Sequence, residues 1–183
     1  LETMPPLDVV EKELIPALDA VGEQYEKQII FLPQLMNAAA ASGAAFDEVR
    51  RVIGQSSAAG EGKGPIVLAT VEGDIHDIGK NIVRTVLENY GFRIVDLGRD
   101  VPAERVVEAV RQYGAKIVGL SALMTTTVPS MEKTITRLHE NGLHVPVIVG
   151  GAVLTPDYAK KIGADYYAKD AKQSADIAKS ILG

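Results

Sequence analysis

The sequence predicts a doubly wound parallel α/β domain preceded by a small helical bundle, and two hydrophobic patterns carry this prediction. Residues 7–58 place apolar side chains at helical spacing and show no strand pattern. Further along, short apolar runs alternate five times with helical segments, as is typical of parallel sheets covered by helices on both faces. Small and polar residues dominate Gly54–Gly64, which we interpret as a linker. We therefore expect a helical domain at residues 1–60 and an α/β domain at residues 61–183.

The helical domain is expected to contain three helices. Pro33 is placed in the first turn of the second helix, where proline is tolerated. Ser42-Gly43 is expected to end that helix. Three helices are fewer than a closed four-helix bundle, so we expect a fourth to precede Leu1 in a longer protein. The expected helices cover residues 7–21, 24–41 and 46–53.

The α/β domain is expected to contain five strands and five helices. The strands are Ile66–Val71, Phe92–Leu97, Ile117–Leu120, Val145–Val149 and Asp165–Ala168. The helices are Gly79–Asn89, Pro102–Tyr113, Val128–Glu140, Asp157–Ile162 and Lys172–Leu182. The first, third and fourth strands are almost continuously apolar, which indicates burial on both faces. The flavodoxin-like strand order 2-1-3-4-5 is predicted, with ligands at the carboxyl ends of the strands.

Composition excludes several classes of function. The net charge is −5 without a long basic stretch, so nucleic acid is not an expected partner. No apolar run reaches ~18 residues and no signal-peptide pattern appears, so we expect a cytoplasmic protein and no membrane span. Cysteine is absent, which excludes disulfides, thiolate zinc sites, iron–sulfur clusters and a cysteine nucleophile. His139 and His144 flank an Asn-Gly turn and are expected to be exposed turn residues. His76 is therefore the histidine that remains as a candidate metal ligand.

The loop after the first strand, Gly73–Gly79, reads Gly-Asp-Ile-His-Asp-Ile-Gly. A histidine at this edge can bind a metal, and a neighbouring carboxylate can hold its other ring nitrogen. Asp74 and His76 are two residues apart, so in an extended segment their side chains point the same way. The alternatives are that Asp74 or Asp77 caps the following helix and that His76 is a structural histidine.

Two more loops reach the same edge. After the third strand stand four hydroxyl residues, more than helix capping needs, and the surplus suggests a polar ligand or a hydrogen-bond relay. After the fourth strand, Gly150-Gly151 lets a ligand or another backbone approach closely, although a plain turn is the alternative. No Gly-x-Gly-x-x-Gly follows the first strand and no Walker A sequence occurs, which disfavours a nucleotide site of either kind. The four hydroxyl residues are Ser121, Thr125, Thr126 and Thr127.

Taken together, the three loops resemble the cobalamin-binding signature Asp-x-His-x-x-Gly, Ser-x-Leu and Gly-Gly. The signature is carried by Asp74, His76, Gly79, Ser121, Leu123, Gly150 and Gly151. The preceding helices resemble the cap of methyl-transferring corrinoid proteins, so the resemblance covers essentially the whole chain. It is closest to the cobalamin (B12) module of cobalamin-dependent methionine synthase.

This resemblance implies that His76 replaces the cobalamin's own base as the lower axial ligand of cobalt. Asp74 would accept a hydrogen bond from the other imidazole nitrogen, and Thr127 would continue the relay, so that proton uptake accompanies loss of the axial bond. Phe31, Leu35 and Met36 would shield the methyl-bearing face, with ordinary bundle core as the alternative for Leu32 and Met36. The cofactor-contacting positions in the α/β domain would be Gly73, Asp74, Ile75, His76, Asp77, Ile78, Gly79, Ser121, Leu123, Thr125, Thr127, Gly150, Gly151, Ala152 and Ala171.

The implied function is a corrinoid methyl carrier, cycling between methylcobalamin and cob(I)alamin, within methionine synthase. The expected donor is methyltetrahydrofolate and the expected acceptor is homocysteine. The chain has no cysteine for a thiolate zinc and no room for a folate barrel, so its partners would be methyl-donor and methyl-acceptor methyltransferase domains or subunits and a reductive-activation partner.

Four alternatives stay open at this stage. The nearest is a stand-alone corrinoid protein of a methanol, methylamine or aryl-ether methyltransferase system. A non-catalytic cobalamin-dependent regulator would need a DNA-binding element, which the acidic chain does not indicate. An adenosylcobalamin mutase typically lacks the helical cap. A receiver-type signalling domain would want an acidic cluster after the first strand and an aspartate after the third, where Ser121 stands instead.

Overall fold

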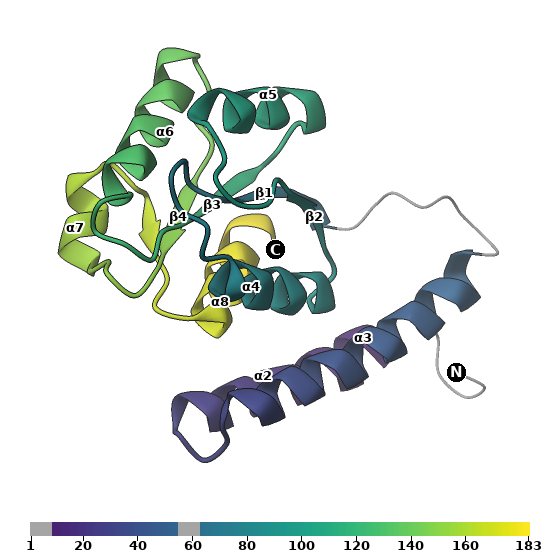
Figure 1. Ribbon diagram of the computed structural model, residues 1–183. Coiled ribbons are helices and arrows are strands. Elements are labelled where there is room, and N and C mark those ends of the chain that lie inside the picture. Colours follow the sequence, from purple (N-terminus) through teal and green to yellow (C-terminus); the bar gives the residue numbers. More distant parts are fainter. Residues whose placement is uncertain (1–8, 55–62) are drawn as a thin grey trace. The chain divides into compact units, whose positions relative to one another are not determined.

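The computed structural model describes residues 9–54 and 63–183 (Figure 1), and the chain divides into two compact units, Leu1–Glu61 and Gly62–Gly183. Most of the expected linker and the first residues of the expected first helix lie outside the described residues. Lys63 and Gly64, which were assigned to the linker, belong instead to the first strand. No helix in the described parts is both long and apolar enough to cross a membrane.

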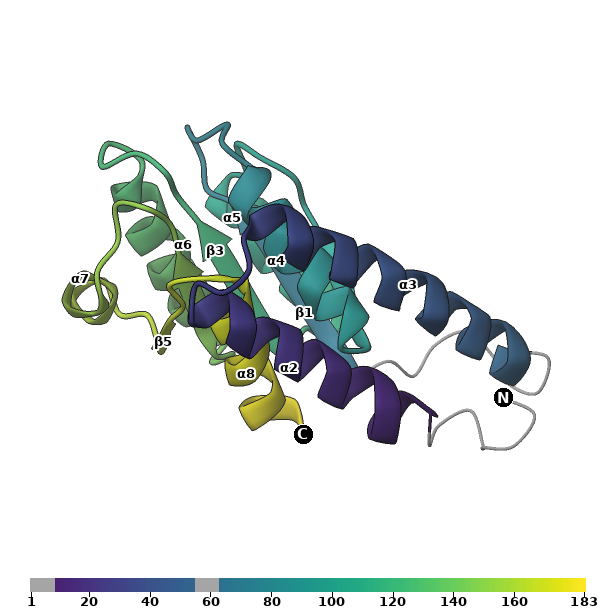
Figure 2. The same cartoon turned by 90° about the horizontal axis from the view of Figure 1, so that it is seen from below.

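The first unit is a pair of helices that lie side by side, α2 (Ile15–Glu26) and α3 (Leu32–Gly54), preceded by the π-helical turn η1 (Val10–Leu14) (Figure 2). Pro33 stands in the first turn of α3, as predicted. The buried side chains recur at helical spacing, so the apolar stripe of the sequence is the face that becomes buried. They are Leu18, Leu35, Ala39 and Val49.

Two boundaries in this unit differ from the prediction. The expected helix 24–41 is interrupted, because α2 ends at Glu26 and the chain turns through Gln28, whose φ is 57°. The expected stop at Ser42-Gly43 and the separate third helix are wrong, since α3 continues to Gly54. A glycine in a helix costs only about 1 kcal/mol relative to alanine, and the surrounding alanines are strong helix formers. The Ser42 hydroxyl donates to the Ala38 carbonyl (2.9 Å), so the serine is accommodated inside the helix.

The second unit is a five-stranded parallel sheet with the order β2-β1-β3-β4-β5, which confirms the predicted topology. The strands are β1 (Lys63–Thr70), β2 (Phe92–Asp96), β3 (Ile117–Ser121), β4 (Val147–Gly150) and β5 (Tyr166–Tyr167). The helices are α4 (Ile78–Asn89), α5 (Ala103–Tyr113), α6 (Val128–Glu140), α7 (Pro156–Lys161) and α8 (Ala171–Leu182). Each expected helix is present within one residue at each end.

Helices cover both faces of the sheet. Figure 1 shows α4 and α8 together on one face and α5 and α6 together on the other. Alternate residues of β1 and β3 pack into the cluster beneath α5 and α6, among them Val67, Ala69, Val118 and Leu120. The residues between them face α4 and α8. The continuous apolar runs therefore reflect strands buried on both sides, as the sequence predicted.

The register of the central strands brings their last residues to a common edge. Thr70 of β1 pairs with Ser121 of β3, and Ser121 pairs with Gly150 of β4. The fifth strand, Tyr166–Tyr167, is shorter than the expected Asp165–Ala168, and just before it the Asp165 carboxylate accepts a hydrogen bond from the Val147 amide (2.8 Å). The three loops that the sequence singled out start at the common edge.

Candidate functional site

Asp74 and His76 form a hydrogen-bonded pair in the loop between β1 and α4. The Asp74 side chain is completely buried, and its Oδ1 accepts from His76 Nδ1 (2.8 Å) and from the His76 amide (3.0 Å). A carboxylate only accepts, so Nδ1 carries the proton in this pair. The His76 side chain is 44% exposed, and Nε2 has no hydrogen-bond partner among the residues that the structure describes. Its lone pair is therefore available to a ligand at the surface.

The other carboxylate oxygen of Asp74 connects this loop to the one after β3. Oδ2 accepts from the Leu123 amide (2.7 Å), the Met124 amide (3.3 Å) and the Thr127 hydroxyl (2.8 Å). Burial raises the pKa of Asp74, but hydrogen bonds from His76, Leu123 and Thr127 outweigh burial and hold that pKa well below its ordinary value. Asp74 is therefore a buried anion whose neighbours are neutral donors and an imidazole.

Thr127 extends the pair into a chain of three side chains. It stands at the N-cap position of α6, yet its side chain does not cap the helix. Its Oγ1 lies 2.8 Å from Asp74 Oδ2 and 2.8 Å from the Met124 carbonyl oxygen, so one hydroxyl proton faces two acceptors. With Asp74 ionised the hydroxyl donates to Oδ2. If Oδ2 gains a proton, it can donate to Thr127, which then turns its own proton to Met124.

The capping alternatives for the first loop are wrong. Asp77 is the N-cap residue of α4 but makes no side-chain capping bond, and the bonds of Asp74 go to His76 and to the loop after β3. Gly79, the second residue of α4, is exposed, and a Cβ there would meet nothing within 4 Å. The start of α4 therefore leaves open space beside His76. We call the segment Gly73–Gly79, which carries this residue, the histidine loop.

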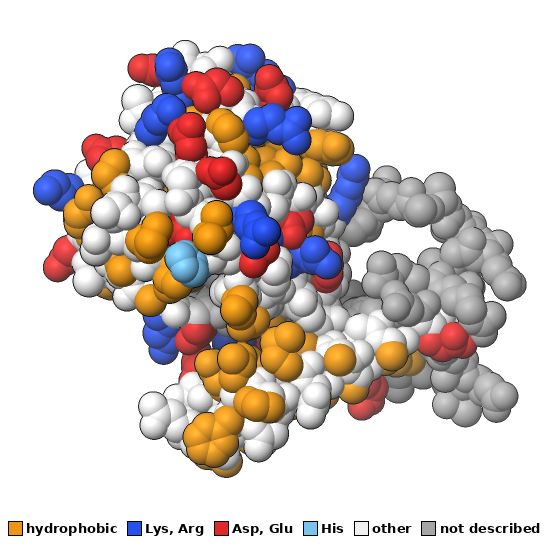
Figure 3. All heavy atoms as spheres, in the orientation of Figure 1, with side chains coloured by type: hydrophobic (Ala, Val, Ile, Leu, Met, Phe, Trp, Pro, Cys, Tyr) orange, Lys and Arg blue, Asp and Glu red, His pale blue; other side chains and the backbone are white. Residues whose placement is uncertain are grey.

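Exposed apolar side chains surround the histidine loop. Ile75 is 59% exposed and Ile78 77%, while Leu123 and Met124 contribute from the loop after β3. Figure 3 shows hydrophobic side chains gathered around a histidine on this unit. Large apolar side chains grouped at the surface mark a binding site, and here they lie around the accessible Nε2 of His76.

Gly150 ends β4 and Gly151 follows it, and a side chain at either position would crowd another backbone segment. A Cβ on Gly151 would overlap the carbonyl oxygen of Ala122, and φ at Gly151 is 148°. A Cβ on Gly150 would lie 3.1 Å from the Ala168 carbonyl oxygen. The close approach of another backbone, one of the uses considered for these glycines, is therefore present, and their contact with a ligand stays a prediction.

Thr70 is a residue that the sequence reasoning missed. Its side chain is fully buried, and Oγ1 is the one buried side-chain polar atom without a partner in the described part of the chain. It stands beside Ser121 at the sheet edge, on the α4 and α8 side. A polar residue ending an otherwise apolar strand was the available signal. An unpartnered buried hydroxyl is costly, so a polar group from a ligand would relieve it.

The remaining predicted positions are spread over several environments. Thr125 and Ala152 are exposed, and Ala171 is buried at the first residue of α8. In the helical unit, Phe31 precedes α3 and is 67% exposed, whereas Leu35 is 7% exposed. Met36 is half-buried. Phe31 and Leu35, which were both expected to shield the methyl group, thus differ in exposure.

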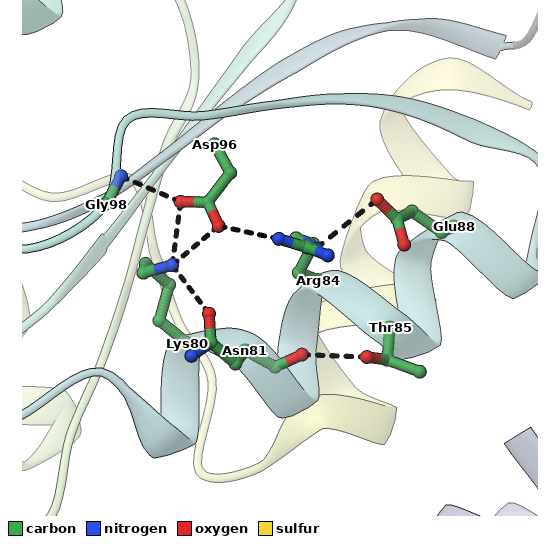
Figure 4. Close-up of polar contacts among 7 residues, drawn as sticks. All are labelled: Lys80, Asn81, Arg84, Thr85, Glu88, Asp96 and Gly98. Carbon is green, nitrogen blue, oxygen red and sulfur yellow. Dashed lines mark hydrogen bonds and ion pairs between the residues drawn. The ribbon is translucent and has the colours of Figure 1, made fainter. Parts of the chain in front are cut away.

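A buried ion pair anchors α4 next to the histidine loop (Figure 4). Lys80 is 3% exposed, and its Nζ donates to both carboxylate oxygens of Asp96 at the end of β2 (2.7 and 2.8 Å) and to Asn81 Oδ1 (2.8 Å). Arg84 adds a bond to Asp96 (3.2 Å). Burial raises the pKa of Asp96, but the bonds from Lys80, the Gly98 amide and Arg84 lower it overall. The pair fixes the first turn of α4.

These residues fit a cobalt-bound corrin. His76 offers a single nitrogen, which suits a metal whose other positions a macrocycle fills, and Asp74 supplies the carboxylate partner that ligating histidines usually have. The exposed apolar side chains suit the broad hydrocarbon edge of such a ring. The unpartnered Thr70 hydroxyl suits a polar tail entering beside the sheet edge.

Comparison with known proteins supports the same cofactor. A family model described as a B12 binding domain matches residues 64–176, and a second model with that description matches residues 1–50. The chain is 44% identical over 179 residues to dimethylamine corrinoid protein 1 of Methanosarcina acetivorans, covering 97% of this chain and 84% of that protein.

Two solved structures are similar over most of the chain. A cobalamin-binding protein from Desulfitobacterium hafniense has a TM-score of 0.81 at 36% identity, covering 91% of this chain and 78% of that one. The methanol:cobalamin methyltransferase complex of Methanosarcina barkeri has a TM-score of 0.81 at 35% identity, covering 97% and 67%.

These findings confirm cobalamin as the cofactor and the corrinoid resemblance. They favour the stand-alone corrinoid protein over the methionine synthase module, and they do not support folate and homocysteine as the specific partners. The chain belongs to the B12-binding corrinoid proteins, the cofactor-carrying parts of methyltransferase systems.

Proposed function

We propose that this chain is the methyl carrier of a methylamine methyltransferase system. One methyltransferase subunit would load it from a methylated amine, and a second would pass the methyl group to an acceptor. The hydrogen-bonded chain from Thr127 through Asp74 to His76 supports the carrier role, because it prepares a surface imidazole to bind a metal. The relative named for dimethylamine supports the choice of donor.

The bound corrinoid would supply the cobalt that accepts and releases the methyl group. The protein's part begins at His76, whose Nε2 would hold the cobalt. Asp74 accepts a hydrogen bond from Nδ1–H, which keeps the proton on Nδ1 and leaves Nε2 as the basic nitrogen. An Nε2 that is not bound to cobalt would be free to take up a proton, and the Asp74 carboxylate would stabilise the imidazolium. Ligation and proton uptake are thus coupled through one buried carboxylate.

The surface around His76 would exclude water from the lower face of the ring. Ile75, Ile78 and Leu123 are exposed without the cofactor, and their burial against it would stabilise binding through the hydrophobic effect. Thr70 and Ser121, paired at the sheet edge, would offer hydroxyl groups to the nucleotide tail.

The helical unit would protect the methyl group. Phe31 presents most of its ring to solvent and is the better candidate for direct shielding. Leu35 is buried and its amide donates to the Phe31 carbonyl, so its contribution would be to hold the turn that carries Phe31. Met36, half-buried, would contribute in part. Replacing Phe31 by alanine should accelerate loss of the methyl group in light.

A methanol system is the second candidate, because the methanol:cobalamin methyltransferase complex aligns with 97% of this chain at a TM-score of 0.81. The two candidates share the fold and the site and differ in the methyltransferase that loads the carrier. Only the loading reaction separates them.

The cofactor site is tested by reconstituting the chain with methylcobalamin and recording its visible spectrum. We expect the base-off, histidine-ligated form in the wild type and in His139→Ala, an exposed histidine far along the sequence, and its loss in His76→Ala. Histidine ligation that survives in His76→Ala would contradict the assignment of the ligand.

The donor is tested by supplying the reduced holoprotein with purified methyltransferases for mono-, di- and trimethylamine, for methanol and for methyltetrahydrofolate. Methylation of the cofactor is followed by its absorption. We expect loading with a methylamine and its enzyme. Loading by the methanol enzyme alone would replace the first candidate with the second.

A further inference from the structure

The loop between β2 and α5 is hydrogen-bonded to the histidine loop through Asp100. Asp100 Oδ1 accepts a hydrogen bond from the Gly73 amide (2.7 Å), and the Asp100 amide donates to the Asp74 carbonyl oxygen (2.9 Å). We propose that Asp100 is a positioning residue for His76, acting through the backbone of residues 73 and 74. This inference rests on the proposed role of His76 as a metal ligand.

The backbone of Asp100 adopts a conformation that serves these two bonds. Its φ is 53°, and among the described residues only Gln28 is another non-glycine with positive φ. L-residues rarely adopt this region, and aspartate tolerates it better than most. Such strain persists where the surroundings hold it, and it gathers at functional sites. Here the reciprocal bonds to Gly73 and Asp74 are what hold it.

Backbone hydrogen bonds connect the segment that carries Asp100 to the sheet. The segment after β2 continues alongside β1, with the Leu97 amide donating to the Leu68 carbonyl (2.9 Å) and the Thr70 amide donating to the Gly98 carbonyl (3.0 Å). The Val101 amide then donates to the Thr70 carbonyl (3.0 Å). The segment that carries Asp100 is therefore hydrogen-bonded to the end of β1, directly before residues 73 and 74, which Asp100 contacts.

The same segment is fixed from its other end by the ion pair of α4. Asp96 accepts from the Gly98 amide (2.9 Å) as well as from Lys80, so the start of α4 and the segment carrying Asp100 share one anchor. The histidine loop runs between these two attachments. Its backbone is thus tied at Gly73 by Asp100 and at α4 by Lys80.

The consequence reaches His76 in two steps. Asp100 fixes the backbone at residue 74, and the Asp74 carboxylate fixes the imidazole through Nδ1. Loss of the Asp100 acceptor removes one hydrogen bond that orders the loop, which corresponds to about tenfold in an equilibrium. We expect the affinity of His76 for cobalt to fall by that factor, because the free loop must first be ordered.

The test uses Asp100→Gly, which tolerates the positive φ and removes the acceptor, and Asp100→Asn, which removes the charge and keeps an acceptor. Asp100→Ala, which also removes the acceptor, is the reserve variant if the glycine variant does not fold by circular dichroism. The first readout is the cofactor-free chain: amide hydrogen exchange at Gly73 and the ring nitrogen shifts of His76 by NMR. We expect about tenfold faster exchange and a mixture of tautomers in Asp100→Gly, and wild-type behaviour in Asp100→Asn.

The second readout is the pH at which the protein histidine leaves cobalt in the reconstituted chain. A weaker bond is displaced by protons at higher pH, so a tenfold loss moves the midpoint up by about one unit in Asp100→Gly. The amide variant should match the wild type.

The outcomes separate this inference from the proposed function. Unchanged Gly73 exchange and unchanged His76 shifts in Asp100→Gly overturn the positioning role, whatever the cofactor does. Faster exchange with an unchanged release midpoint also overturns it, because the loop would be held without consequence for ligation. A wild type that never ligates cobalt through His76 refutes the proposed function, and the cofactor-free readout still decides whether Asp100 orders the imidazole.

Discussion

Asp74 and Asp96 are two carboxylates near the same edge of the sheet, and they are kept ionised by different means. Asp74 is fully buried and accepts from three backbone amides, a hydroxyl and an imidazole. Asp96 accepts from the buried Lys80 ammonium, from Arg84 and from one amide. Burial raises the pKa of each carboxyl, and in each case the hydrogen bonds lower it further than burial raises it.

The difference explains why one carboxylate is structural and the other can take part in chemistry. The charge of Asp96 is neutralised by the cations beside it, so it serves as an attachment between β2 and α4. Neutral donors stabilise the charge of Asp74 without cancelling it, which leaves the charge to act on His76. A cation among the partners of Asp74 would compete with the imidazolium that the proposed function requires at this site.

The largest expected effect is on the Asp96 side of this comparison. Lys80→Met should lower the free energy of unfolding by about 3 kcal/mol, because it leaves Asp96 without its buried partner. Arg84→Met should cost much less, since the Arg84 side chain is 45% exposed. Urea denaturation measures both.

The double variant Lys80→Met/Asp96→Leu serves as the control, because replacing both charges by apolar groups should recover most of the loss. If the double variant is less stable than Lys80→Met alone, the ion pair is not the source of the effect.

The next largest effect is expected from Asp74→Asn, on the affinity of His76 for cobalt. An amide cannot act as an anion toward His76 Nδ1, so cobalt–histidine affinity should fall about 10- to 100-fold, as for other partners of metal-ligating histidines. The release pH of the histidine, followed by visible absorption, measures it. Asp157→Asn, an exposed aspartate of α7, is the control and should leave the release pH unchanged.

Thr127→Val should reduce the same affinity by about fivefold, because the hydroxyl supplies one of several bonds to Asp74. Thr127→Ser keeps the donor and should restore the wild-type value. Thr134→Val removes another buried hydroxyl of α6, one bonded to the Ser130 carbonyl (2.7 Å), and should change stability without changing ligation. Equal release midpoints in Thr127→Val and Thr127→Ser would exclude Thr127 from the relay.

The smallest expected effect is on the pH dependence of stability. Asp74 and Asp96 both have a pKa below the ordinary value of 3.8, so the unfolded chain binds more protons at acid pH. Their contribution is fully present above that value and is lost as the pH falls below it. The acid limb should be shallower in Asp74→Asn and in Asp96→Asn than in the wild type, as measured by urea denaturation between neutral and acid pH. An unaltered acid limb in both variants would show that neither carboxyl titrates abnormally.

The sequence was informative wherever one pattern of residues decides the structure. Continuous apolar runs identified the central strands, and the spacing of Asp74 and His76 indicated their hydrogen bond, because both signals are local. It was misleading at Gly43, where the surrounding alanines maintain the helix. Local patterns gave no account of the partner of Lys80, and they allowed a backbone to approach Gly151 without identifying it as Ala122, since Asp96 and Ala122 lie far away in sequence. Those contacts depend on the packed sheet.

The central claim is that Asp74 presents His76 Nε2 to cobalt. Electron paramagnetic resonance of the chain loaded with cobalamin in its cobalt(II) state tests it most directly, using protein grown with ordinary or nitrogen-15 histidine. The account predicts that the nitrogen hyperfine pattern changes with the isotope in the wild type and that this dependence is absent in His76→Ala. A pattern that does not respond to labelled histidine in the wild type would contradict the account.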